Sequence, residues 1–217
     1  MFERMREAWG GIPLRIENDG DVTALAGAVA LRDNAVLGLA MGSSLAAGYV
    51  DPEGRIQGWM NELAFAPLDY RPDAAADEWS GDRGVGANYL SQQAVGRLIP
   101  LAGIAMPEIP EADLPRRLVR VQELMRQGDA RARRIYETIG RYLGYTVAHA
   151  FDFYPDIRHV EILGRVMTGD GGRVILDEAR RVLDAEFPEL AERFSFYEPS
   201  EREKRHGQAA AAAHLPA

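Results

Sequence analysis

The stretch RIENDGDVTALAGAVALRDNAVLGLAMG, residues 15–42, decides the fold class of this chain. Its first residues complete a short apolar run over 12–18 that predicts a strand. The alanine-rich segment over 19–32 predicts a helix, and the apolar run over 35–42 predicts a buried strand that ends in Gly-Ser-Ser. Strand, helix and strand in this order are typical of an α/β protein.

The remaining segments extend this pattern to both ends of the chain. Residues 66–87 are predicted to be loop, and 99–115 form a connector punctuated by prolines. The other expected elements are a helix over 1–10, a hairpin over 45–59 with its turn at 51–54, helices over 88–98, 129–153 and 169–187, strands over 159–164 and 193–199, and a short closing helix over 206–215. This order predicts a mixed sheet with helices packed on it.

Composition narrows the class of protein. The 217 residues are 47% hydrophobic and 27% charged, which is typical of one globular domain or one large lobe. A net charge of −8 argues against a nucleic-acid groove, which needs a concentrated basic face. No apolar run approaches the roughly 20 residues that cross a bilayer, so no membrane partner is expected. The chain has no cysteine, hence no disulfide and no thiolate metal site, and we expect a cytoplasmic location.

Asn18 and Asp19 are the first candidate site residues. They follow the expected strand, and the carboxyl ends of strands are where α/β proteins bind ligands. A carboxylate there could accept a proton from a substrate hydroxyl, with Asn18 holding a neighbouring hydroxyl. The alternative is structural, because Asp19 or Asp21 could simply be the N-cap of the following helix.

The turn Gly42-Ser43-Ser44 is the second candidate. Backbone N–H groups in such a turn can close around a phosphate. The same residues also suit an ordinary hairpin turn, so the pattern alone leaves both interpretations open.

Two other patterns carry little weight. GDRGVGANY, residues 81–89, resembles a dinucleotide-binding loop, but no strand is expected before it and the last glycine position holds Tyr89. The histidines are scattered without metal-ligand spacing, so we interpret them as structural or solvated; they are His149, His159, His206 and His214.

Taken together and in order, these segments resemble the C-terminal lobe of the ROK family (repressors, uncharacterised frames and sugar kinases). The resemblance runs from residue 10 to the final helix, over nearly the whole chain. It implies an actin-like ATPase and sugar kinase fold, which is ribonuclease H-like, as one lobe over 1–217. The family's Asp-x-Gly-x-Thr hairpin, which belongs to an N-terminal ATP-binding lobe, is missing here.

The resemblance assigns the sugar side of the site. Its strand-Asn-Asp-helix segment matches residues 16–19, which makes Asp19 the base that deprotonates the sugar hydroxyl and Asn18 a sugar contact. Its Glu-x-Gly-His segment matches Glu62-Leu63-Ala64-Phe65, which keeps Glu62 as a sugar contact and replaces the histidine by Phe65.

The resemblance also assigns the nucleotide-binding residues and predicts that the family's zinc site is absent. The family's Gly-Thr-Gly phosphate turn matches Gly42-Ser43-Ser44, and Gly164 matches the first glycine of the turn near the adenine, with Arg165 at the second. The family's cysteine-rich zinc loop matches 78–95 without any cysteine, and its sugar-binding glutamate has become Ala87. We therefore expect no zinc.

The implied function of a complete protein is ATP-dependent phosphorylation of a hexose or related sugar, with Mg²⁺ bridging the phosphates. A non-catalytic, sugar-sensing regulator is the competing interpretation, favoured by Phe65, Ala87 and the missing lobe. An interaction domain of unrelated α/β fold is a third. The expected partner is a small-molecule sugar rather than nucleic acid, and the long helix over 129–153 offers an interface for a homodimer.

Overall fold

The protein is described by a computed structural model that covers residues 1–57 and 61–213. Its strands form one mixed sheet in the order β2-β1-β3-β4. β1 pairs antiparallel with β2 and parallel with β3, and β3 pairs parallel with β4. Their bounds are β1 (Val36–Met41), β2 (Leu45–Val50), β3 (His159–Leu163) and β4 (Ser195–Tyr197). The carboxyl ends of β1 and β3 therefore meet at one edge of the sheet.

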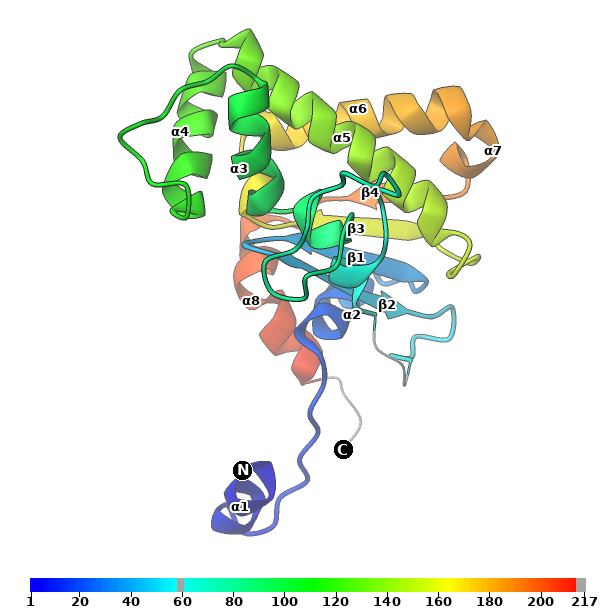
Figure 1. Cartoon of the computed structure of the whole chain (residues 1–217). Coiled ribbons are helices and arrows are strands. Elements are labelled where there is room, and N and C mark those ends of the chain that lie inside the picture. The colour runs from blue at the N-terminus through cyan, green and yellow to red at the C-terminus, as the bar shows by residue number, and fades with distance from the viewer. Residues whose placement is uncertain (58–60, 214–217) are drawn as a thin grey trace.

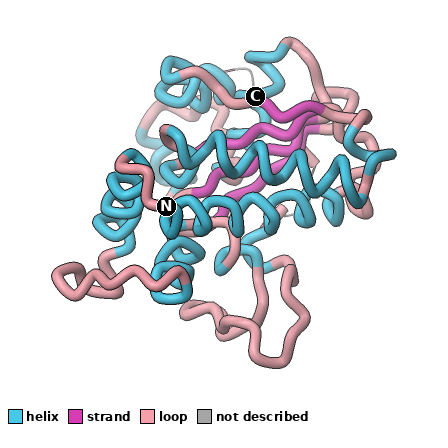
Figure 2. The backbone as a smooth tube through the Cα atoms, turned by 90° about the horizontal axis from the view of Figure 1, so that it is seen from above, coloured by secondary structure: helices cyan, strands magenta, loops and turns pink. Residues whose placement is uncertain are grey.

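Helices cover both faces of this sheet. Figure 1 shows α5 and α6 above the sheet, α2 and α8 below it, and α3 with α4 beyond one end. Viewed from above, two long helices run across the strands (Figure 2). The bounds are α1 (Phe2–Ala8), α2 (Asp19–Leu31), α3 (Gln92–Leu101), α4 (Leu114–Arg126), α5 (Ala130–Ala150), α6 (Asp170–Glu186), α7 (Pro188–Ala191) and α8 (Glu201–Ala212), with short 3₁₀ turns η1 (Leu63–Phe65), η2 (Gly86–Asn88) and η3 (Arg165–Met167). The expected α/β class with a mixed sheet is confirmed.

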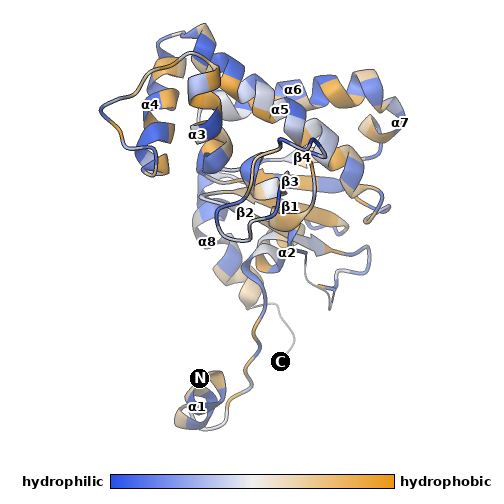
Figure 3. Ribbon diagram, in the orientation of Figure 1, coloured by the Kyte–Doolittle hydropathy of each residue, from blue (hydrophilic) through white to orange (hydrophobic). Residues whose placement is uncertain are grey.

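The sheet divides two cores of unequal size. Alternate residues of β1 point to opposite faces, so Leu37, Leu39 and Met41 join the large core with α5 and α6. Val36 joins a smaller core under α2. The strands are the most hydrophobic part of the fold in Figure 3, as expected when both faces of a sheet are covered.

α2 lies unusually close to β2 because glycines face each other where they cross. A Cβ added at Gly48 would lie 2.3 Å from the carbonyl carbon of Gly20, and one added at Gly20 would lie 2.0 Å from the carbonyl oxygen of Ala47. The beginning of α2, which carries Asn18 and Asp19, is thus placed against the sheet by backbone contact.

We expect Gly48→Ala to lower the free energy of unfolding by about 1–3 kcal/mol, because the added methyl group must push α2 away from β2. Urea unfolding followed by circular dichroism measures this. Gly42→Ala is the matched control, since a Cβ there meets only the Ser44 oxygen at 3.6 Å. Equal stabilities of the two variants would contradict the packing argument.

The expected strand over 12–18 is wrong. Residues 12–17 are not paired with any described strand, and Ile12, Leu14 and Ile16 are exposed. The alternating pattern is present, but a strand needs a neighbour to satisfy its backbone groups, and none of the four strands supplies one. The helix expected over 1–10 forms as α1, which has no buried residue and lies away from the body (Figure 1).

Smaller differences have local causes. The helix expected over 88–98 begins only at Gln92, because Ser91 caps it by accepting from the N–H of Gln93. The hairpin over 45–59 forms its turn, but its second arm makes a single bridge, Val50 to Ile56, and residues 58–59 lie outside the described part. α4 was not anticipated at all. The closing helix begins earlier than expected, at a capping box on Ser200, and its expected end at 214–215 lies outside the described residues.

Within residues 1–57 and 61–213, no helix combines the length and the apolar character that crossing a bilayer requires.

Candidate functional site

Asn18 and Glu62 meet at the beginning of α2. Asn18 is the N-cap, and its side-chain oxygen accepts from the N–H of Gly20 at 2.8 Å. Its amide nitrogen donates to Glu62 Oε1 at 3.2 Å. The structure therefore brings together the two residues expected to contact the sugar, although they lie 44 positions apart in the sequence.

Asp19 is the first residue of α2 and its side chain is exposed. Because Asn18 occupies the N-cap, the expectation that Asp19 or Asp21 caps α2 is wrong. Among the described residues the Asp19 carboxylate has no hydrogen-bond or ion-pair partner; only its backbone oxygen is engaged, by Thr23 Oγ1. The carboxylate is thus uncommitted and open to solvent at a helix N-terminus, which favours negative charge there.

A buried chain of hydrogen bonds supports the contact between Asn18 and Glu62. The Tyr154 hydroxyl donates to Asn61 Oδ1 at 2.6 Å, and Asn61 Nδ2 donates to Asp21 Oδ1 at 2.8 Å. Burial raises the pKa of Asp21, against the lowering effect of the Asn61 and Tyr49 hydrogen bonds. Since Asn61 directly precedes Glu62, this chain fixes the position of Glu62 beside Asn18.

Asn61 and Tyr154 were not anticipated from the sequence, and Asp21 was considered only as a cap. The signal that could have drawn attention to Asp21 is an acidic residue in the first turn on the face of α2 that turns toward the sheet. Its partners come from a loop and from the chain just after α5, which local pattern does not connect.

We expect Tyr154→Phe to destabilise the protein by about 1–3 kcal/mol, because Asn61 Oδ1 then stays buried without its donor. Thermal unfolding measures the change. Tyr70→Phe is the control, since Tyr70 is 78% exposed. A Tyr154→Phe protein as stable as this control would contradict a supporting role for the buried chain.

The Gly42-Ser43-Ser44 turn joins β1 to β2 at the edge where β1 ends. The N–H of Gly42 donates to the Ser44 oxygen at 2.9 Å, and the Gly42 oxygen accepts from the N–H of Gln92 at 2.9 Å, which anchors the start of α3. Ser43 and Ser44 are exposed. The segment forms a hairpin turn, which was one of the two interpretations. Because the Gly42 N–H is already engaged, only Ser43 and Ser44 remain available to bind a phosphate.

Gly164 follows β3 and packs against the end of β1. Its φ of 108° and the 2.4 Å between an added Cβ and the Met41 oxygen both require glycine at this position. Gly164 thus touches the residue that precedes Gly42. The residues expected to bind nucleotide lie together, although close packing by itself explains the glycine.

Phe65 and Ala87, which replace polar residues of the family, also have apolar surroundings in the structure. Phe65 packs against the large core and its ring lies 5.5 Å from that of Trp79. Ala87 is buried in the same core. Neither offers a polar group to a sugar.

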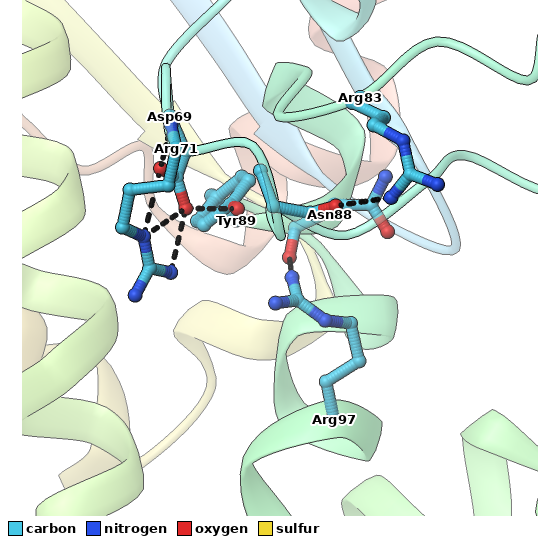
Figure 4. A network of polar contacts seen from close by, with 7 residues as sticks. Asp69, Arg71, Arg83, Asn88, Tyr89 and Arg97 are labelled. Atoms are coloured by element: carbon cyan, nitrogen blue, oxygen red, sulfur yellow. Dashed lines mark hydrogen bonds and ion pairs between the residues drawn. The ribbon is translucent and has the colours of Figure 1, made fainter.

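The loop expected to lack zinc is held by polar contacts (Figure 4). Asp69 accepts from Arg71 at 2.7 Å and from the Tyr89 hydroxyl at 2.6 Å, and the Arg71 hydrogen bond lowers the pKa of Asp69. Arg97 lies over the Tyr89 ring at 4.9 Å and donates to the Asn88 oxygen at 2.6 Å. These contacts hold Asn88 and Tyr89, in the later part of the loop, against Asp69 and Arg97.

The described residues contain no cluster of three or more His, Cys, Asp or Glu side chains placed to hold a metal ion. Absence of zinc stays a prediction, which elemental analysis of the purified protein tests directly. We expect less than about 0.1 zinc per chain and no change in melting temperature with a chelator, because no thiolate is available. One tightly held equivalent would overturn it.

The histidines differ in their surroundings. His159 is structural, because its ring nitrogens contact Asp33 Oδ2 at 2.9 Å and Ser195 Oγ at 3.0 Å. His149 lies 3.3 Å from Asp152, and His206 is exposed. His214 lies outside the described residues. GDRGVGANY forms loop and η2 without a preceding strand, so the structure offers no support for a dinucleotide loop there.

Comparisons with known proteins were made at the level of sequence and of structure. No family profile and no curated protein matches the sequence. The structure matches a ROK family glucokinase from Streptomyces griseus, solved with glucose and AMPPNP, with a TM-score of 0.70 at 20% identity over 95% of this chain and 69% of that one.

Two further solved structures show the same similarity. A ROK hexokinase from Thermus thermophilus has a TM-score of 0.70 at 21% identity over 96% of this chain and 67% of that one. A ROK family transcriptional regulator, a homologue of the E. coli MLC protein, has a TM-score of 0.73 at 19% identity over 97% of this chain and 54% of that one. This chain therefore has the actin-like α/β fold that ROK sugar kinases share with a ROK regulator.

Proposed function

We propose that this chain is the sugar-binding lobe of a ROK-type kinase, which transfers the γ-phosphoryl group of ATP to a hydroxyl of a hexose or related sugar. The observation that carries the proposal is the contact between Asn18 and Glu62 beside the uncommitted Asp19 carboxylate. Hydroxyl-binding groups and a free base in one corner are what this reaction needs on the acceptor side.

In this mechanism Asp19 accepts the proton of the attacking sugar hydroxyl. Asn18 and Glu62 hold neighbouring hydroxyls through their paired amide and carboxylate groups, which orients the sugar toward the base. General-base assistance of this kind is worth about 10²–10⁴ in rate.

The nucleotide side rests on fewer observations. The exposed Ser43 and Ser44 would line the phosphates of ATP and Gly164 would lie near its adenine, with Mg²⁺ supplying charge neutralisation when bound. The S. griseus neighbour was solved with AMPPNP, an ATP analogue. The turn is less well suited to a phosphate than Asn18, Asp19 and Glu62 are to a sugar. The reason is that the Gly42 N–H already donates to the Ser44 oxygen.

A second part is needed for efficient transfer. Asp19 is open to solvent, whereas phosphoryl transfer depends on groups that enclose the reacting atoms from both sides. The two kinase neighbours are longer, since this chain corresponds to 69% and 67% of their lengths. The exposed apolar side chains of residues 1–17 offer a surface for such an ATP-binding part; they are Met1, Phe2, Met5, Trp9, Ile12, Leu14 and Ile16.

A sugar-sensing regulator is the second candidate, and specific observations favour it. The match to the transcriptional regulator has a TM-score of 0.73. Phe65 and Ala87 are apolar where the resemblance expects sugar contacts, and the Gly42 turn is closed on itself. A protein of this kind would keep the contact between Asn18 and Glu62 and have no use for Asp19 as a base.

Location and assembly remain proposals. We propose a cytoplasmic protein that acts on a small sugar without contacting nucleic acid, consistent with its net charge of −8. α5 is the proposed surface for a homodimer.

In a protein that includes the ATP-binding part, we expect Asp19→Asn to lower sugar-dependent release of ADP by about 10²-fold or more while sugar affinity stays within about threefold, because the amide keeps the shape and loses the base. A coupled assay with ATP and Mg²⁺ over hexoses and amino sugars measures the first quantity, and calorimetry measures the second. Asp177→Asn is the matched control, an exposed acid on α6.

The outcomes separate the two candidates. Sugar binding without ADP release by a wild-type protein that includes the ATP-binding part, and without any effect of Asp19→Asn, supports the sensor and rejects the kinase. Loss of sugar binding in Glu62→Gln supports both. No sugar binding by the wild type rejects both.

A further inference from the structure

A pocket of about 370 Å³ opens between α2 and α8, over the C-terminal half of α2. Its lining includes Ala26, Val29, Ala30, Glu161, Tyr197 and Glu203. None of these residues belongs to the proposed sugar-binding or nucleotide-binding site, so the pocket is a separate feature of the fold.

Glu161 is the unusual residue in this pocket. It lies in the middle of β3 and is only 3% exposed, and its Oε2 atom has no hydrogen-bond partner among the described residues. Its neighbours Val160 and Ile162 point into the large core, so Glu161 points to the opposite face, toward α2. A buried acid without a partner is costly and therefore rare in a structural role.

The fold makes room for this carboxyl group. A Cβ added at Gly27 of α2 would lie 2.5 Å from Glu161 Oε2. The cross-strand partner of Glu161 on β1 is Gly38, which also carries no side chain. Burial raises the pKa of Glu161 to about 8, with a further contribution from the charge of Glu203.

The other polar groups of the pocket lie either in its interior or at its exposed rim. Glu203 accepts from the N–H of Ser200 at 2.6 Å, and this hydrogen bond lowers the pKa of Glu203, so that it stays anionic. Burial raises the pKa of Tyr197 to about 12, so that its hydroxyl stays neutral. Arg202 and His206 also line the pocket, but both are exposed. The interior therefore presents two carboxyl groups and a hydroxyl, and α2 adds only apolar side chains there.

We propose that this pocket binds a small primary ammonium compound with a short alkyl chain, its ammonium group paired with Glu161 and its chain lying along Ala26, Val29 and Ala30. An ammonium group donates three hydrogen bonds and carries one positive charge, which would offset the charge of an ionised Glu161 beside Glu203. A metal ion fits less well, because no cluster of three ligating side chains exists among the described residues.

Butylammonium is the probe, with 1-butanol as the neutral analogue and butyrate as the anion. We expect saturable binding of butylammonium by calorimetry and by chemical-shift changes at residues of α2 and α8. Glu161→Gln should weaken this binding about 10–100-fold, because a charge-assisted hydrogen bond is lost. Glu137→Gln, a partly buried acid on α5 that pairs with Arg133 far from this pocket, is the matched control.

Proton release gives a second, independent measurement. Burial raises the pKa of Glu161 to about 8, so the bound ammonium must ionise this carboxyl group, and the number of protons released on binding should be larger at pH 7 than at pH 9. Calorimetry in buffers of different ionisation enthalpy measures this number. The Glu161→Gln protein supplies the background from His206 and the other groups of the pocket.

Two results would overturn the proposal. One is the absence of saturable binding of butylammonium to a wild-type protein that unfolds cooperatively. The other is equal affinity of 1-butanol and butylammonium, or of wild type and Glu161→Gln, which would leave Glu161 as a neutral buried acid without a ligand. If Glu161→Gln fails to fold, proton release by the wild type alone decides the question.

Discussion

The hydrogen bonds that run from Tyr154 through Asn61 to Asp21 hold the candidate site together. They join the chain after α5, the loop before η1 and the first turn of α2, which are three segments far apart in the sequence. In the low-polarity interior each of these groups is costly to leave unpaired, so the three segments are fixed as a set. Glu62 follows Asn61 directly, and it therefore reaches Asn18 from a defined position.

The close approach of α2 to β2 adds the second constraint. Because Gly20 and Gly48 bring two backbones into contact, the N-terminus of α2 has little freedom relative to the sheet. Asn18 then serves two purposes: it caps the helix with its oxygen and holds Glu62 with its nitrogen. This division leaves the Asp19 carboxylate uncommitted, and a proposed base needs that freedom.

The same arrangement explains why the two faces of the sheet differ. The face toward α5 and α6 is filled by large apolar side chains and is closed. The face toward α2 and α8 has glycines and alanines, so α2 lies low over the sheet and a smaller core remains beside it. Glu161 occupies this second face, where Gly27 and Gly38 leave space for a carboxyl group instead of a packed aliphatic chain.

Much of the element order was predictable because it depends on local pattern. The continuous apolar run that became β1 and the 3.6-residue spacing that became α5 are both local signals. The strand expected over 12–18 shows the limit, since Ile12, Leu14 and Ile16 have the right alternation but no pairing strand among those described. α4 was not predicted because it begins within the proline-rich connector, where Pro115 lies in the first turn of the helix and is compatible with it.

The sequence by itself determined the α/β class, the order of its main elements and the residue types available at the candidate site. Only the tertiary structure decided that Asn18 meets Glu62 and that Gly164 touches Met41. The physical reason is that helices and strands depend on neighbouring residues, whereas these contacts depend on the strand order and on the path of loops that close long stretches of chain.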